Sequence, residues 1–120
     1  METDQFGRRR DILQAARLTG TYVKGVAEAE FGQDTEKQDA VIRRIEIIGE
    51  ATAHLSQRTR QAVAELPFRK MGGMRNIVAH DYAGVDVGIV WEVATIYVPE
   101  VRMVLEKFFG EHPEPTCKPC

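Results

Sequence analysis

Arg75, His80 and Tyr82 stand close together in the sequence and carry side chains suited to phosphoryl chemistry. A histidine near its ordinary pKa of about 6.5 can accept and return a proton at neutral pH. A guanidinium can bind a phosphate and the charge that develops on it. The pair therefore suffices for metal-independent cleavage of RNA, in which the ribose 2′-hydroxyl attacks its own 3′ phosphate, and this chemistry needs no bound cofactor.

Spacing alone does not bring Arg75 and His80 together. They are five positions apart, about 500° of rotation in an unbroken α-helix, so their side chains would point roughly 140° away from each other. Three arrangements remain open: the helix ends near Ala79, the long arginine reaches round the helix, or two protomers complete the site. Gly72 and Gly73 just upstream lack side chains and would let another backbone approach closely.

A structural interpretation competes with the catalytic one. In it, His80 simply ends a helix and Arg75 pairs with Asp81 or Asp86. Asn76 shares a helix face with His80, four positions on. Under the catalytic interpretation Asn76 would hydrogen-bond a substrate and Asp81 would pair with the arginine or the histidine, whereas a helix-terminus role explains both equally well.

Apolar residues at three- and four-residue intervals predict four to five helices, and no segment shows sustained period-two alternation. The fold class is therefore all-α, an antiparallel helical bundle. Gly20 and Gly25 in the first segment indicate close packing, and Pro99 in the last predicts a kink or break. The predicted segments are Asp4 to Glu30, Glu36 to Leu55, Ser56 to Leu66, the segment from Pro67 that carries Arg75, and Val87 to Phe109.

Residues with capping side chains predict where these helices begin. Asp34 or Thr35 can cap the second segment, Ser56 the third and Asp86 the last. Pro67 suits the first turn of the fourth because its missing N–H would have no partner there.

The overall charge is −2 over 120 residues, whereas domains that bind nucleic acids usually carry a basic excess. Between Arg58 and Arg75, however, basic residues outnumber acidic ones. A basic strip that binds RNA and an ordinary solvated helix face explain this local excess equally well. The strip comprises Arg58, Arg60, Arg69, Lys70 and Arg75, against Glu65 alone.

The length predicts one domain, over residues 1–110, followed by a disordered tail over residues 111–120. Cys117 and Cys120 in this tail have only His112 nearby as a further zinc ligand, so we expect neither a metal site nor a redox pair. The N-terminus lacks the apolar region of a signal peptide and no stretch suits a membrane span, which predicts a cytoplasmic protein.

The stretch Arg75-Asn-Ile-Val-Ala-His-Asp-Tyr82 resembles the Arg-x4-His-x-Tyr motif of HepT toxins in the HEPN superfamily. The segment from Asp39 to Ala51, with its Ile-Gly-Glu-Ala core, resembles the family's second-helix block. Val85-Asp86, Val90-Trp91 and Val98-Pro99 resemble the helix after the motif. The likeness covers roughly residues 8–108. Phe68 follows Pro67 where the family often has tryptophan, so an aromatic is kept.

This resemblance implies a HEPN-like ribonuclease of cellular RNA that assembles as a homodimer, with Arg75 and His80 as its catalytic pair. It also implies a partner, a minimal nucleotidyltransferase antitoxin called MntA, which transfers AMP from ATP onto Tyr82. ATP would serve the antitoxin, and the ribonuclease itself would need no cofactor. An AMP group on Tyr82 would fill the place of an RNA phosphate and add negative charge there.

Structural roles are the simpler interpretation for the remaining conspicuous residues. We expect His54 to be partly buried, and Trp91 and Tyr97 to serve packing or a dimer interface. Glu50 could reach the motif across the bundle, although a charged helix flank is the simpler interpretation. The run Arg8–Arg10 could contact RNA, although an exposed helix start is the simpler interpretation.

Two other functions are compatible with the sequence. The near-neutral charge favours a non-catalytic helical dimer that binds a nucleotidyltransferase. Alternatively, Arg75 and His80 could hold the phosphate of a nucleotide without cutting anything.

Overall fold

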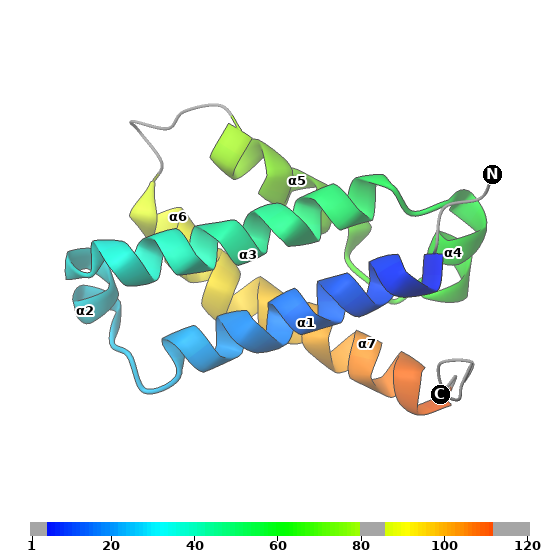
Figure 1. Ribbon diagram of the computed structural model, residues 1–120, viewed down its shortest axis with the longest axis horizontal. Helices are drawn as coiled ribbons and strands as arrows, with labels where there is room; N and C mark the ends of the chain where they lie inside the picture. The colour runs from blue at the N-terminus through cyan, green and yellow to red at the C-terminus, as the bar shows by residue number, and fades with distance from the viewer. Residues whose placement is uncertain (1–4, 80–85, 112–120) are drawn as a thin grey trace.

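The computed structural model describes residues 5–79 and 86–111, and side chains for residues 5–74 and 86–111. All secondary structure in these residues is helical, which confirms the all-α class (Figure 1). The elements are α1 (Gln5–Val23), α2 (Glu28–Gln33), α3 (Thr35–Ala53), α4 (Gln57–Ala62), α5 (Phe68–Ala79), α6 (Val87–Glu92), the π-helical turn η1 (Val93–Tyr97) and α7 (Val98–Glu111).

The two long helices α1 and α3 run antiparallel at the centre of the molecule (Figure 1). The start of α1 is tied to the end of α3 by one side chain. Gln5 donates from Nε2 to the His54 carbonyl (3.1 Å) and accepts at Oε1 from the Ser56 N–H (2.7 Å). Helix α5 packs on α3, and α7 packs on α1, so the central pair supports the helix that carries Arg75.

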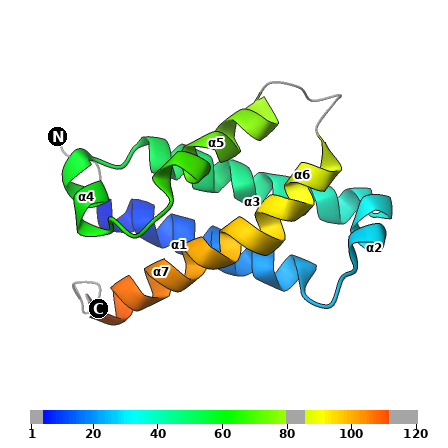
Figure 2. The same cartoon turned by 180° about the vertical axis from the view of Figure 1, so that it is seen from behind.

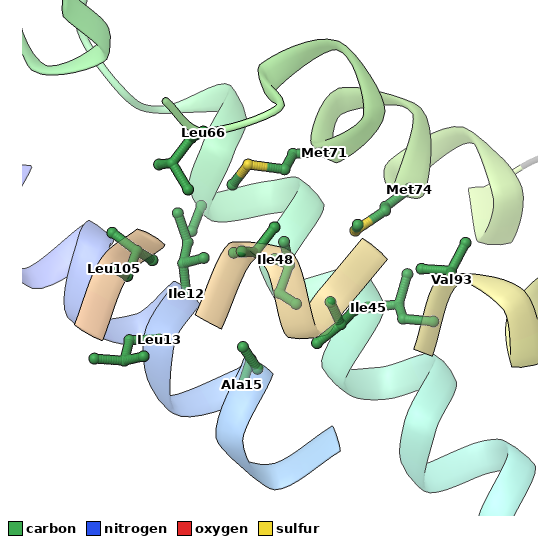
Figure 3. Close-up of a cluster of buried hydrophobic side chains, with 14 of the residues drawn as sticks. Ile12, Leu13, Ala15, Ile45, Ile48, Leu66, Met71, Met74, Val93 and Leu105 are labelled. Atoms are coloured by element: carbon green, nitrogen blue, oxygen red, sulfur yellow. The ribbon is translucent and has the colours of Figure 1, made fainter. Parts of the chain in front are cut away.

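The core lies where these helices meet (Figure 3). Each fully buried aliphatic side chain there contributes about 1.5–3 kcal/mol relative to an exposed one. The core therefore fixes α5 against α3 and α7 against α1. Its completely buried members include Ile12, Ile45, Ile48, Met71 and Leu105.

Three predicted helix caps are confirmed. The side chain of Asp34 accepts from the Lys37 N–H (3.0 Å) and that of Ser56 from the Thr59 N–H (3.1 Å). Asp86 Oδ1 accepts from the N–H groups of Gly88 and Ile89, at 2.8 and 3.3 Å. Each bond satisfies a donor that the first turn of a helix leaves without a partner.

The first helix is shorter than predicted. It ends at Val23 and does not continue to Glu30, because Gly25 has a φ of +73°, a left-handed conformation that turns the chain. The residues after this turn form the separate helix α2, whose Phe31 is completely buried and packs on Trp91 with ring centroids 5.1 Å apart. This contact shows the packing role expected for the tryptophan.

Close packing is confirmed at Gly20, where an added Cβ would lie 3.3 Å from Arg102 Nη1, but the prediction is wrong for Gly25, where an added Cβ would meet nothing within 4 Å. His54, by contrast, is exposed and not partly buried as predicted. It occupies the C-cap of α3, just beyond the last helical residue, so the apolar stripe of that helix no longer determines its environment.

Pro99 does not break the last helix. The turn before it widens instead, because the Val98 N–H bonds to the Val93 carbonyl five residues back, as in a π-helix. Proline has no N–H to donate to Thr95 and its ring would crowd that carbonyl in a regular α-helix. The widened turn accommodates the ring, and α6, η1 and α7 continue as one rod (Figure 2).

No helix in the described parts of the chain is both long and apolar enough to cross a membrane. Helix α7 includes Glu111. The rest of the predicted tail, residues 112–120 with His112, Cys117 and Cys120, lies outside the described residues, and its disorder stays a prediction.

Candidate active site

Helix α5, which carries Arg75 and Asn76, is anchored at its first turn. The Pro67 carbonyl accepts the N–H of Met71 (3.0 Å), so the proline stands immediately before the helix, at its N-cap. The guanidinium of Arg60 lies 5.3 Å from the centre of the Phe68 ring. The aromatic residue after Pro67 therefore joins α5 to α4.

The inner face of α5 is apolar and points at α3. Met71 and Met74 are buried and extend toward Ile48 and Ile45 (Figure 3). Arg75 directly follows Met74, so the packing of this methionine fixes the backbone position of the proposed phosphate-binding residue.

The structure does not decide how the proposed catalytic residues meet. It places the backbone of Arg75 and Asn76 in α5, but their side chains, and all of His80, Asp81 and Tyr82, lie outside what it describes. The three arrangements that the spacing left open therefore remain open.

The segment that contains His80 and Tyr82 is bounded by firmly placed residues on both sides. Before it, Met74 is 1% exposed. After it, Asp86 caps α6 and Val90 is completely buried. The described residues on either side of positions 80–85 thus belong to helices fixed to one core.

The outer face of α5 is open beside Arg75. Gly72 is exposed, and an added Cβ at Gly72 or Gly73 would meet nothing within 4 Å. These glycines lie three and four residues after Arg69, hence on the same side of the helix. No bulky side chain of α5 therefore separates Arg69 from Asn76 along this side.

The basic residues of the predicted strip divide into two groups. Arg60 donates to two carbonyls at the end of α3, and Lys70 Nζ lies 4.4 Å from the centre of the Tyr97 ring. Arg58 and Arg69 are exposed and have no hydrogen bond or ion pair within the described residues. The strip is therefore part structural and part solvent-facing, and the Lys70 contact is consistent with the packing role expected for Tyr97, which is partly buried against the core.

Within helix α5 the charged residues are all basic. Helix α5 contains Arg69, Lys70 and Arg75 but no aspartate or glutamate. Glu65 lies 3.7 Å from Lys107, and Glu50 is exposed on α3. This helix is thus a local basic element in a chain whose net charge is −2.

Charge is more tightly paired on the far side of the bundle. Arg17 and Arg102 both contact Glu106, at 3.0 and 3.3 Å. The hydrogen bond from Arg17, with a further contribution from Arg102, lowers the pKa of Glu106 below its ordinary value. Among the residues that the structure describes, no cluster of three potential metal ligands occurs.

Sequence comparison connects this architecture to a known family. A sequence model of the ribonuclease HepT-like family matches residues 12–108, which include all of α3 and α5 and the residues between α5 and α6. The chain belongs to the HepT-like ribonuclease family.

Individual members of the HepT-like family are similar over most of this chain. A Thermococcus cleftensis protein named "Probable ribonuclease HepT" is 34% identical over 97 residues, covering 81% of this chain and 88% of that protein. A Methanocaldococcus jannaschii protein named "Gamma-glutamylcyclotransferase and putative RNase" is 38% identical over 100 residues, 83% of this chain but only 45% of that longer protein. No solved structure matches the chain.

Proposed function

We propose that this protein is an endoribonuclease that cleaves cellular RNA without a bound metal ion and acts as the toxin of a toxin–antitoxin pair. The observation that carries the proposal is the match to a ribonuclease family over residues 12–108, which includes the positions of Arg75 and His80. The chemistry of these two side chains supports it, because together they supply a proton acceptor and a phosphate-binding cation.

In the proposed reaction, His80 takes the proton from a ribose 2′-hydroxyl as that oxygen attacks the adjacent phosphorus. The new P–O2′ bond forms while the P–O5′ bond breaks, leaving a 2′,3′-cyclic phosphate. The departing 5′-oxygen receives a proton from His80 or from the same residue of a second protomer. Arg75 binds the non-bridging phosphate oxygens, whose negative charge grows in the transition state. Asn76 and Asp81 are supporting residues in this scheme.

The surroundings of α5 favour an RNA substrate despite the negative net charge. Arg69 is exposed and unpaired among the described residues, on the side of α5 where two glycines leave the surface open. A cation placed there can hold a neighbouring phosphate while Arg75 engages the one that is cut. Phosphate contacts of this kind supply most of the sequence-independent affinity for a nucleic acid.

Control of this activity would act through Tyr82. We propose that an MntA-like nucleotidyltransferase antitoxin transfers AMP from ATP to its phenol oxygen, with pyrophosphate leaving. The added nucleotide would occupy the space of an RNA phosphate and repel the substrate by its charge, so inhibition would be both steric and electrostatic. The active ribonuclease would be a homodimer.

The test is RNA cleavage by the purified protein and by Arg75→Ala and His80→Ala variants, with helix content checked by circular dichroism. Both variants should lose cleavage and growth arrest while keeping the helical fold. Full cleavage by both would overturn the catalytic assignment. For the regulation, intact mass should rise by whole AMP increments only when the antitoxin is co-expressed, and a Tyr82→Phe variant should show no increment.

A non-catalytic alternative is favoured by one observation, the net charge of −2. In that case the protein would be a helical dimer that binds a nucleotidyltransferase or a nucleotide. RNA that stays intact with unmodified protein, alongside tight binding of the neighbouring gene product or of ATP in calorimetry, would establish this alternative.

A further inference from the structure

Two arginines from different helices converge on one carboxylate oxygen where α7 packs on α1. The Nε of Arg17 lies 3.0 Å from Glu106 Oε2, and the Nε of Arg102 lies 3.3 Å from the same oxygen. Like charges held so close together repel each other, and the single carboxylate neutralises only one of the two guanidiniums. The cluster therefore keeps a net positive charge that a further anion can offset.

The Nη groups of these two arginines remain accessible to a ligand. Among the described residues, Arg17 and Arg102 bond to Glu106 only through Nε, and their side chains are 54% and 44% exposed. Gly20 lets Arg102 lie close to α1, since a Cβ there would be 3.3 Å from Arg102 Nη1. The planar guanidinium is suited to phosphate, whose oxygens it binds bidentately. The cluster thus has both the charge and the donors that a phosphate requires.

A groove on α1 adjoins this cluster. It is lined by the buried Leu13 and the exposed Arg10, Gln14 and Arg17. The two arginines are seven residues apart, about two turns and roughly 10 Å along the helix, so they lie on the same side of α1. The one acidic residue of this helix, Asp11, lies about 100° round the helix from Arg10. The groove therefore presents basic and neutral side chains along its length.

We propose that Arg10, Arg17 and Arg102 form a second surface for the RNA backbone, the α1–α7 surface. One phosphate binds the Nη groups of Arg17 and Arg102 and offsets the charge that Glu106 leaves unmatched. Arg10 binds another phosphate of the same strand. Because the arginines of α1 are about 10 Å apart, an occupant with several linked phosphates fits the surface better than a single phosphate or a mononucleotide does.

The α1–α7 surface lies apart from the candidate active site. Helix α5 packs on α3, whereas the surface lies where α7 packs on α1, so the two central helices separate them (Figure 1). The surface therefore holds RNA without taking part in its cleavage. It rests on the proposed function only in the choice of RNA as the occupant. It also places affinity for RNA in a local group of cations, within a chain whose net charge is −2.

The test is fluorescence anisotropy of a labelled polyuridylate strand with 2′-O-methylated riboses. This strand keeps its phosphates but lacks the attacking hydroxyl, so binding is measured without cleavage. Arg17→Gln and Arg102→Gln should each raise Kd at least about threefold. Each should also reduce the slope of log Kd against log salt by about 0.7, the value for one phosphate contact on a single strand. Circular dichroism should show unchanged helix content, because both side chains are largely exposed.

Arg43→Gln is the matched control. Arg43 is an exposed arginine of α3 that likewise pairs with a carboxylate, that of Glu46, at 2.8 Å. This variant changes the net charge by the same amount and should leave Kd and its salt dependence unchanged. Equal weakening by Arg43→Gln would show that only the overall charge matters and would overturn the inference. Unchanged binding in both Arg17→Gln and Arg102→Gln would overturn it as well.

Calorimetry with inorganic phosphate and with ATP identifies the occupant. If either binds the unmodified protein but not Arg17→Gln, while strand binding is the same in both, the surface serves a free phosphate or nucleotide and the assignment to RNA is wrong. The outcome is separate from that for ribonuclease activity. A protein that fails to cut RNA would overturn the proposed function, but the binding of an uncleavable strand would still test this surface.

Discussion

Arg60 holds three elements together at the end of the bundle that leads into α5. Its Nη2 donates to the Thr52 carbonyl (2.8 Å) and its Nε to the Leu55 carbonyl (3.3 Å). Both acceptors lie at or just beyond the end of α3, where a helix has unsatisfied carbonyls and a partial negative charge that favours a cation. Its guanidinium also lies over the Phe68 ring.

Replacement of Arg60 by alanine should therefore lower the free energy of unfolding by more than is usual for a residue that water can reach. A hydrogen bond to a charged group contributes about 1.5–3 kcal/mol when well sheltered, and a partly exposed cation–π contact about 0.5–1 kcal/mol. Because the side chain is only half-buried and water can replace it at the carbonyls, we take the lower ends for the two hydrogen bonds and the cation–π contact and expect a total loss of about 3.5 kcal/mol. For a chain of this size that lowers Tm by roughly 14 °C.

The assay is urea denaturation followed by circular dichroism, with Arg60→Lys and Arg58→Ala as comparisons. Lysine keeps the charge but cannot reach two carbonyls with the same planar group, so about half of the loss should remain. Arg58→Ala removes an exposed arginine of the same helix and should change stability by less than about 0.5 kcal/mol. If Arg60→Ala is no more destabilising than Arg58→Ala, the proposed joining role is wrong.

Three further predictions concern a helix cap, a charge pair and the substrate surface. Asp86→Ala should cost about 1 kcal/mol and speed hydrogen exchange at the start of α6, whereas Asn at this position should retain most of the cap. Glu106→Gln should lower stability at pH 7 by up to about 1 kcal/mol. Since the pKa of Glu106 is lowered by Arg17, this contribution is present above the ordinary pKa near 4.5 and lost as pH falls through the lowered value, so the two proteins should converge in acid. Arg69→Gln should raise KM for RNA several-fold with little change in kcat, and it should reduce the salt dependence of KM. Lys24→Gln, at an exposed position in the turn between α1 and α2, should do neither.

Local signals in the sequence predicted the helix starts well. Asp34, Ser56 and Asp86 act through hydrogen bonds within three residues, so residue type and position suffice to identify them. The end of α1 was harder, because apolar spacing continues through the turn and only the backbone shows that Gly25 is left-handed. The exposure of His54 likewise depends on where α3 ends.

The candidate site was predictable in composition but not in geometry. Sequence identified Arg75 and placed it on a helix, and the structure shows that this helix is fixed to the core through Met71 and Met74. The contacts of Lys70 with Tyr97 and of Arg60 with Phe68 join residues far enough apart along the chain that only the packed fold reveals them.

The π-helical turn before Pro99 contains one residue more than a regular α-helical turn, and this extra residue is what makes room for the proline. Such a turn absorbs one inserted residue while the helical segments on either side keep their faces, so deleting one residue from Val93–Tyr97 could restore a regular α-helix without rotating α6 against α7. Pro99 would then clash with the carbonyl four residues back, at a cost of about 3 kcal/mol. The deletion should be tolerated only together with Pro99→Ala. Relatives in which this helix is one residue shorter should therefore lack the proline as well, and the two changes would be gained or lost as one evolutionary step.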